Sequence, residues 1–263
     1  MRKFLKTLGW SALGAALLAF SSGPILSAAV RPGTARFNKA RFEADLPKTA
    51  PHKLSDLYKV FEEALRQGLG AQVKPESIRI RGQSWELLSN ARFPQVEIKL
   101  KPFDTQGLRF NKAGFFFRKM DVDRSALWKS RIKVLQVREV QSRLVFTLSS
   151  LGLKLAGPSG VEPRLQADMD NQELIVDAQG SICGISCGVE SRCHFVWDET
   201  SKTLRLVPLE RRFGGHLIPH WLWALGKGPV TDKPILDFGF SWIPFNIQQV
   251  HVGWDEVDLS TDW

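Results

Sequence analysis

The stretch Val96–Lys101 (VEIKLK) alternates apolar and charged residues, and it decides the class of fold. In an extended chain its apolar residues fall on one side and its charged residues on the other, which is typical of an antiparallel strand with one side in water. The same pattern recurs at Ile78–Arg81, Leu174–Ala178 and Val250–Trp254. No βαβ rhythm is present, so the sequence predicts an α+β fold made mainly of antiparallel strands.

Leu54–Gly70 is the clearest helix in the sequence. Its apolar residues repeat at three- and four-residue steps, and glycines end the pattern. Shorter helices are predicted at Ser84–Asn90, Thr147–Leu155 and Leu217–Leu225. We expect a long curved sheet with the amphipathic helix in its concavity, an arrangement similar to the TULIP-like lipid-binding folds that cradle acyl chains.

The N-terminus has the three regions of a secretory signal peptide. Basic residues precede the apolar stretch Leu8–Phe20, and the small residues Ser27–Ala29 suit a cleavage site. Residues 1–29 are therefore predicted to be a signal peptide. An uncleaved membrane anchor is the alternative, because no charged residue occurs from Thr7 to Val30. In either case we expect export to the periplasm or cell envelope.

The rest of the chain divides into two predicted parts. Residues 30–53 are basic and show no periodicity, so they are predicted to form a tether, whereas residues 54–263 are predicted to form a single β-rich domain. The sequence has 36 Lys and Arg against 27 Asp and Glu, a net charge of +9, which favours an anionic partner. Basic runs are never longer than two residues, so nucleic acid is not the expected partner.

The order of short apolar segments points to a family. The chain carries in succession Trp85–Leu88 (WELL), Phe93–Lys101, Met120–Asp123 (MDVD), Val145–Leu148 (VFTL) and Trp242–Phe245 (WIPF). This succession resembles the LmeA-like phospholipid-binding family of exported bacterial proteins. The resemblance implies binding of anionic phospholipids at the cell envelope and supplies no catalytic residue. The three cysteines and the Trp-rich segment before the last strands depart from the family pattern.

Two sets of residues are predicted to contact lipid, and the first lines an apolar groove in the sheet. That set comprises Trp85, Leu87, Leu88, Phe115, Phe117, Leu151 and Leu155. Burying an acyl chain there releases about 0.8 kcal/mol per methylene. Apolar residues at strand spacing are equally typical of a plain core, which is the alternative.

The second set is an apolar segment near the C-terminus, with Trp221, Leu222, Trp223 and Leu225. The two tryptophans lie two positions apart, so they cannot share one face of a helix. Such a segment is either fully buried or dipped into a membrane interface. Arg211 and Arg212 just before it are candidates for contact with a lipid phosphate, with a solvated pair at a strand end as the alternative.

Two other functions remain open. The segment 184–188 (GISCG) matches the G-x-S-x-G nucleophile elbow of α/β-hydrolases, and Asp198, Asp237 and His251 follow it in the required order. A secreted serine esterase using Ser186 is therefore an alternative, although the residues after it alternate like a strand where the elbow requires a helix. The other alternative is a structural envelope protein that binds no lipid, which a dry, packed concavity would favour.

The cysteines predict one disulfide and no metal site. A hairpin turning at residues 184–186 would place Cys183 and Cys187 on facing strands, with Cys193 left free. The spacing of the cysteines and of His194 does not match a standard zinc pattern. We therefore expect no metal and no cofactor.

Overall fold

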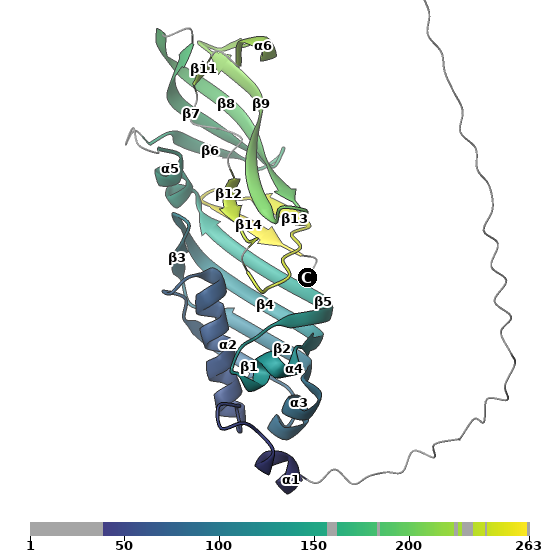
Figure 1. Ribbon diagram of the computed structural model, residues 1–263. Helices are drawn as coiled ribbons and strands as arrows, with labels where there is room; N and C mark the ends of the chain where they lie inside the picture. Colours follow the sequence, from purple (N-terminus) through teal and green to yellow (C-terminus); the bar gives the residue numbers. More distant parts are fainter. Residues whose placement is uncertain are drawn as a thin grey trace, which may run out of the picture. The chain divides into compact units, whose positions relative to one another are not determined.

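Two antiparallel sheets and a long helix make up the part of the protein that the computed structural model describes (Figure 1). The described residues are 39–156, 162–182, 185–223, 226–227, 234–239 and 241–261. They belong to one unit, Asn38–Trp263. The predicted α+β class with mainly antiparallel strands is confirmed.

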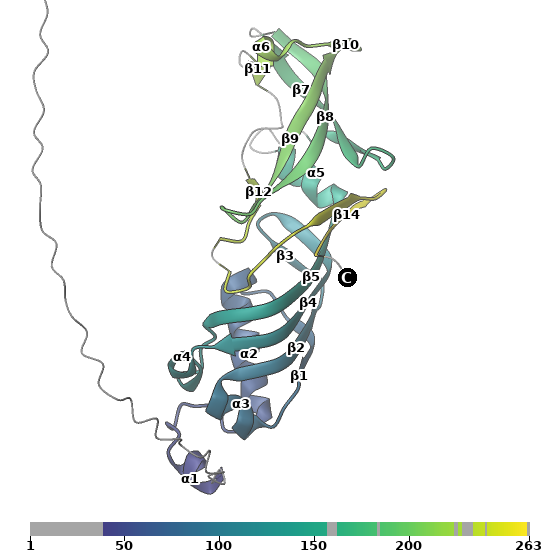
Figure 2. The same ribbon diagram turned by 90° about the vertical axis from the view of Figure 1, so that its right-hand side faces the viewer.

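The first sheet has the strand order β1-β2-β4-β5-β14-β13, with β3 paired to β4. Its strands are β1 (Pro75–Ile80), β2 (Arg92–Leu100), β3 (Phe103–Thr105), β4 (Leu108–Val122), β5 (Val134–Thr147), β13 (Gln249–Val252) and β14 (Glu256–Ser260). Leu259 of β14 lies opposite Leu144 of β5. The last two strands of the chain therefore complete a sheet begun by the first ones (Figure 2).

The second sheet has the order β10-β9-β8-β7-β11, with β12 paired to β9 and β6 paired to β7. Its strands are β6 (Arg164–Asp168), β7 (Glu173–Ile182), β8 (Ile185–Asp198), β9 (Thr203–Phe213), β10 (His216–Leu217), β11 (Gly226–Lys227) and β12 (Pro234–Asp237). Consecutive long strands pair with one another here, so hairpins build this sheet.

The helices are α1 (Lys39–Ala44), α2 (Leu54–Leu69), α3 (Ser84–Asn90), α4 (Arg124–Trp128), α5 (Leu148–Ala156) and α6 (His220–Trp223). The predicted helices at the positions of α2, α3 and α5 are confirmed. The predicted helix over Leu217–Leu225 is shorter than expected. Leu217 belongs to β10, and residues 224–225 lie outside the described residues.

The ends of α2 follow from its sequence. The Asp56 carboxylate accepts hydrogen bonds from the backbone N–H groups of Lys53 and His52, at 3.1 and 3.2 Å, and so satisfies donors at the N-terminus. Gly70 ends the helix with a φ of 124°, a conformation that favours glycine. Between these ends, one face of the helix is buried, as its periodicity predicts.

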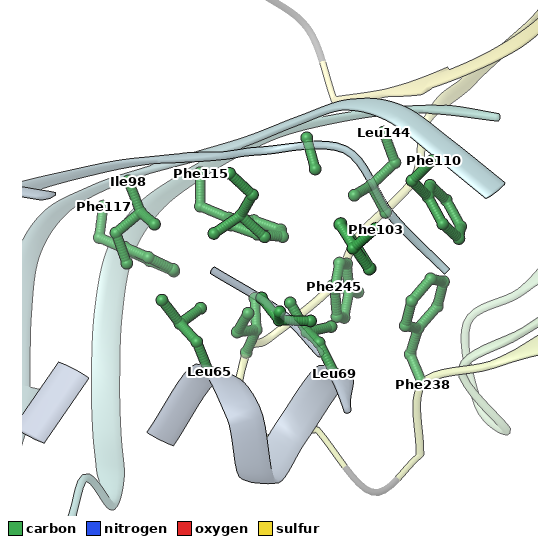
Figure 3. Packing of buried hydrophobic residues seen from close by; sticks show 14 of the residues in the cluster. Leu65, Leu69, Ile98, Phe103, Phe110, Phe115, Phe117, Leu144, Phe238 and Phe245 are labelled. Carbon is green, nitrogen blue, oxygen red and sulfur yellow. The ribbon is translucent and has the colours of Figure 1, made fainter. Parts of the chain in front are cut away.

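The core of the first sheet lies between its strands and α2 (Figure 3). Ile98, Phe115 and Phe117 point from the strands toward the helix, and Leu65 and Leu69 point back from it. All five side chains are at most 5% exposed. This face of the sheet is therefore dry and closely packed.

Trp242 fixes α2 against this core. Its indole N–H donates to the backbone oxygen of Ala64 at 2.8 Å, and its ring centroid lies 6.2 Å from Phe61 and 5.9 Å from Phe117. The ring also lies so close to Gly68 that a Cβ there would come within 3.1 Å of it. The helix glycine thus permits close approach of a residue far away in sequence.

The two sheets are joined by a side-chain clamp at Gln106. This residue lies in the turn between β3 and β4, with a φ of 51°. Its amide nitrogen donates to the backbone oxygen of Asp237 at 2.6 Å, and its amide oxygen accepts from the Asp237 N–H at 2.8 Å. Since Asp237 belongs to β12, one side chain ties the first sheet to the second.

The predicted tether is wrong for residues 39–53. Leu46 and Ala50 are at most 8% exposed, and the ring of Phe42 in α1 packs on Trp128 with centroids 6.5 Å apart. Apolar residues scattered without a helical period can still pack when other elements form pockets for them, which a periodicity argument does not detect. Residues 30–38 of the predicted tether lie outside the described residues.

Candidate functional site

The residues predicted to line a groove in the first sheet mostly form its core. Five of them are at most 2% exposed: Leu87, Leu88, Phe115, Phe117 and Leu151. The other two, Trp85 and Leu155, are partly exposed. The ring of Phe115 packs edge-on against Phe245, with centroids 5.6 Å apart. Side chains from α2 and from residues 241–248 therefore fill the concavity in which an acyl chain was expected.

A hairpin at one end of the second sheet offers a different site. β9 and β10 are joined by Gly214 and Gly215, whose φ angles of 54° and 82° suit the two-residue turns that glycine favours. Leu217 lies opposite Arg212 and shares a face of the hairpin with it, while Phe213 lies opposite His216 and faces the other side. α6 follows directly and lies at the same end of the sheet in both views (Figures 1 and 2).

Among the described residues of this hairpin and of α6, three large apolar side chains are exposed. Phe213 is 48% exposed, Leu217 63% and Trp221 71%. We call these three residues the apolar tip. Single apolar residues on a surface are ordinary, but several on one hairpin and its adjoining helix are typical of a surface that contacts a partner or a membrane.

Trp223 attaches α6 to the sheet and turns Trp221 outward. The Trp223 indole N–H donates to the backbone oxygen of Ile218 at 2.9 Å. The Arg211 guanidinium lies over its ring at 4.9 Å, and the His220 ring stacks on it at 3.9 Å. Trp223 is thus partly buried while Trp221 faces water, so the expectation that the two indoles do not share a face is confirmed. Of the alternatives for this segment, full burial is wrong.

The other predicted residues of this segment lie as follows. Leu222 is partly exposed, and Leu225 lies outside the described residues. Arg212 pairs with Glu210 at 3.1 Å, and their side chains are 40% and 42% exposed. Exposed ion pairs of this kind contribute about 0–1 kcal/mol, so Glu210 holds Arg212 only weakly. Arg211 also lies near the tip, where its guanidinium packs on the ring of Trp223.

Sequence reasoning missed Phe213 and did not select Leu217 as a site residue. The signal that points to them is the Gly-Gly pair that follows Phe213, because a two-residue turn between short strands brings its flanking residues to the end of a sheet. His216 and His220 are also exposed here. Basic, imidazole and aromatic side chains therefore share this end of the second sheet.

Ser186 does not lie on a nucleophile elbow. It is inside β8, opposite Ser181 of β7, and β8 continues as a strand to Asp198 where the elbow requires a turn and a helix. At about 3.3 Å per residue, Asp198 is about 40 Å along the strand from Ser186. His251 belongs to β13 of the other sheet and Asp237 to β12. The residues that the esterase alternative requires are therefore not brought together.

Cys193 is a buried free thiol, as predicted, and burial raises its pKa to about 12. The hairpin of β7 and β8 turns earlier than expected, so the residue opposite Cys187 is Gly180 and not Cys183. Cys183 itself lies outside the described residues, and its disulfide with Cys187 stays a prediction.

In the described part of the chain, no group of His, Cys, Asp and Glu side chains is arranged to hold a metal ion. No helix among the described residues is both long and apolar enough to span a membrane. The sequence matches no protein-family model and no curated protein, and the chain matches no solved structure.

Proposed function

We propose that this chain is an exported phospholipid-binding protein that docks on anionic membranes of the bacterial cell envelope through the apolar tip, without catalysis. The observation that carries this proposal is the exposure of Phe213, Leu217 and Trp221 beside two arginines. The net charge of +9 and the succession of segments that resembles the LmeA-like family support it. The packing of an amphipathic helix on a curved antiparallel sheet supports a TULIP-like architecture.

The apolar tip has a composition suited to a membrane interface. Tryptophan is enriched at the level of the lipid head groups. Full burial of one large apolar side chain releases about 1.5–3 kcal/mol, so three side chains exposed by about half to two-thirds release about 3–5 kcal/mol on immersion. Each nearby arginine adds about 1 kcal/mol at an anionic surface. These magnitudes describe reversible docking and not permanent insertion.

We assign the lipid contact to the tip because the concavity of the first sheet is filled. An acyl chain placed there would displace side chains such as Phe115 and Leu65, which are at most 1% exposed. The tip requires no such rearrangement, because its side chains already face water. We therefore propose that the protein contacts lipids that remain in the membrane, and not that it extracts a whole lipid.

Vesicle flotation of the full-length protein tests this proposal. We expect more binding to phosphatidylglycerol vesicles than to phosphatidylcholine vesicles, and less binding as salt is raised. Replacing Leu217 and Trp221 together by serine is expected to weaken binding by at least about tenfold, because this removes most of the apolar area of the tip.

The chain provides a matched control at another place. Leu135 is 64% exposed and Trp254 is 77% exposed, so a Leu135→Ser and Trp254→Ser double variant removes the same residue types at similar exposure. It is expected to bind vesicles like the unaltered protein. Equal losses in both double variants would contradict docking through the tip.

A structural envelope protein that binds no lipid is the second candidate. The observation that favours it is the filled concavity of the first sheet, since a lipid carrier of the expected kind would need space there. This candidate predicts that the protein ignores vesicles of either composition. The flotation experiment therefore decides between the two.

A further inference from the structure

The face of the first sheet that points away from α2 carries a hollow of about 610 Å³. Phe115 points toward α2 (Figure 3), so its strand neighbours Gly114 and Phe116 point the opposite way. In the register of the sheet, Gly114 lies between Lys99 of β2 and Arg143 of β5. The missing side chain of Gly114 therefore opens the floor of the hollow.

The backbone does not require glycine at position 114. A Cβ there would meet nothing closer than the backbone oxygen of Ile98 at 3.6 Å, which is an ordinary contact, and the residue does not have a positive φ. Glycine weakens a strand that is paired on both sides, as β4 is. A glycine where a larger residue fits indicates that the open space itself has a use.

The walls of the hollow combine an apolar surface with cations. Phe116 and Pro102 supply the apolar part, Lys99, Lys112 and Arg143 supply positive charge, and Glu76 and Glu97 supply negative charge, so cations outnumber carboxylates by one. The volume lies within the range of about 300–1,000 Å³ that is usual for small-molecule sites. An apolar pocket with a few convergent polar groups is the arrangement expected of such a site.

Of the three cations, Lys112 is the one best placed to meet a ligand. Arg143 is bound to Asp258, with a nitrogen–oxygen distance of 2.6 Å, and Lys99 lies 3.8 Å from Glu97. Within the part of the chain that the structure describes, Lys112 forms no ion pair. An anionic ligand group therefore meets an ammonium that is not held in an ion pair, while Glu97 is already paired with Lys99 and Arg79.

A β-bulge in β4 aims this lysine. The register between β4 and β5 shifts just before Lys112, so Asn111 and Lys112 both lie on the exposed side while Ala113 is buried. Bulges re-aim side chains in this way and interrupt the ladder as they do so. The bulge and Gly114 thus both interrupt the regular sheet, and both lie at this hollow.

We infer that this hollow binds a small amphipathic organic anion. Its flat apolar body lies over Gly114 against the ring of Phe116, and its carboxylate, sulfonate or phosphate lies on Lys112. The site belongs to the outer face of the first sheet and shares no residue with the apolar tip. It therefore stands or fails separately from the proposed membrane docking.

Titration of the full-length protein with the aromatic sulfonate 1-anilinonaphthalene-8-sulfonate, followed by dye fluorescence, tests the inference. The titration uses the Leu217→Ser and Trp221→Ser background, so that dye on the tip does not contribute. Gly114→Val places a branched side chain on the floor of the hollow, where the flat body of the ligand would lie, and is expected to weaken binding by at least about tenfold. The same change is expected to raise the unfolding midpoint by about 1–4 °C, because valine suits a strand better than glycine.

Lys112→Glu is the second variant, and it leaves the volume of the hollow nearly unchanged. It is expected to weaken dye binding about fivefold, with a smaller effect at high salt. Gly188→Val in β8, where a Cβ would meet nothing within 4 Å, and Lys129→Glu, an exposed lysine elsewhere, are the matched controls. Dye binding by Gly114→Val or Lys112→Glu that equals binding by these controls would overturn the inference.

Discussion

Truncation of two neighbouring phenylalanines distinguishes a packed core from a lipid groove in the first sheet. Phe117 is fully buried, and its ring centroid lies 5.9 Å from Trp242 and 6.3 Å from Phe115. Phe116 lies on the opposite face, is partly exposed, and has the Arg118 guanidinium 5.8 Å from its ring centroid. The two positions carry the same side chain on the same strand, so each controls for the other.

We expect Phe117→Ala to lower the free energy of unfolding by about 3–5 kcal/mol, because the lost burial and the new cavity add in a packed core. Phe116→Ala is expected to lower it by about 1 kcal/mol or less, since it loses only partial burial and a weak cation–π contact. Urea unfolding followed by circular dichroism measures both values.

Two results would refute this reasoning. One is an equal cost at both positions, and the other is a cost below about 1 kcal/mol at Phe117, which would mean that its surroundings are not close-packed. Should Phe117→Ala fail to fold, Phe117→Leu is compared with Phe116→Leu, and we expect a cost of about 1 kcal/mol at Phe117 and almost none at Phe116, so that equal costs would again refute the reasoning. A charged residue at Phe117 or Leu88 is expected to prevent folding and not merely to remove lipid.

Two further predictions concern the clamp and the free thiol. Gln106→Asn keeps a residue that tolerates positive φ, but its shorter side chain loses the two hydrogen bonds to Asp237. We therefore expect the free energy of unfolding, measured in urea, to fall by about 1–2 kcal/mol. A stability equal to that of the unaltered protein would show that the clamp contributes nothing. The pKa of the Cys193 thiol is about 12 in the folded chain and about 9 when exposed, so its contribution is fully present below pH 9 and is lost as pH rises toward 12, by about 1.4 kcal/mol per unit. Unfolding curves from pH 8 to 11 are expected to fall more steeply for the unaltered protein than for Cys193→Ala, and equal slopes would contradict the assignment.

Much of the fold was predictable because local periodicity and burial coincide in it. The repeat in Leu54–Gly70 predicts a helix with one apolar face, and α2 has that face buried. Alternation at Val96–Lys101 predicts a strand with one wet side, and β2 buries Val96, Ile98 and Leu100. These features depend only on neighbours in sequence, which a pattern records directly.

The candidate site was less predictable, because the exposure of an apolar side chain depends on which other elements pack over it. Alternation at Phe115 and Phe117 is the same whether the apolar side meets a lipid or α2, and only the position of α2 and Trp242 decides. Trp221 and Trp223 likewise have similar neighbours in sequence, so the sequence does not show which of the two indoles is exposed. The contact of Trp223 with Arg211, which leaves Trp221 outward, requires β9 to lie beside α6.

The hydrogen bond from Trp242 to α2 has a consequence for how the chain is made. It joins residues 178 positions apart, and the pair Arg143–Asp258 spans 115 positions. A chain that emerges N-terminus first has therefore exposed α2 and most of the first sheet long before the residues that cover them exist. Such late closure predicts slow folding and a long-lived, collapse-prone nascent state, in which a chaperone has time to bind.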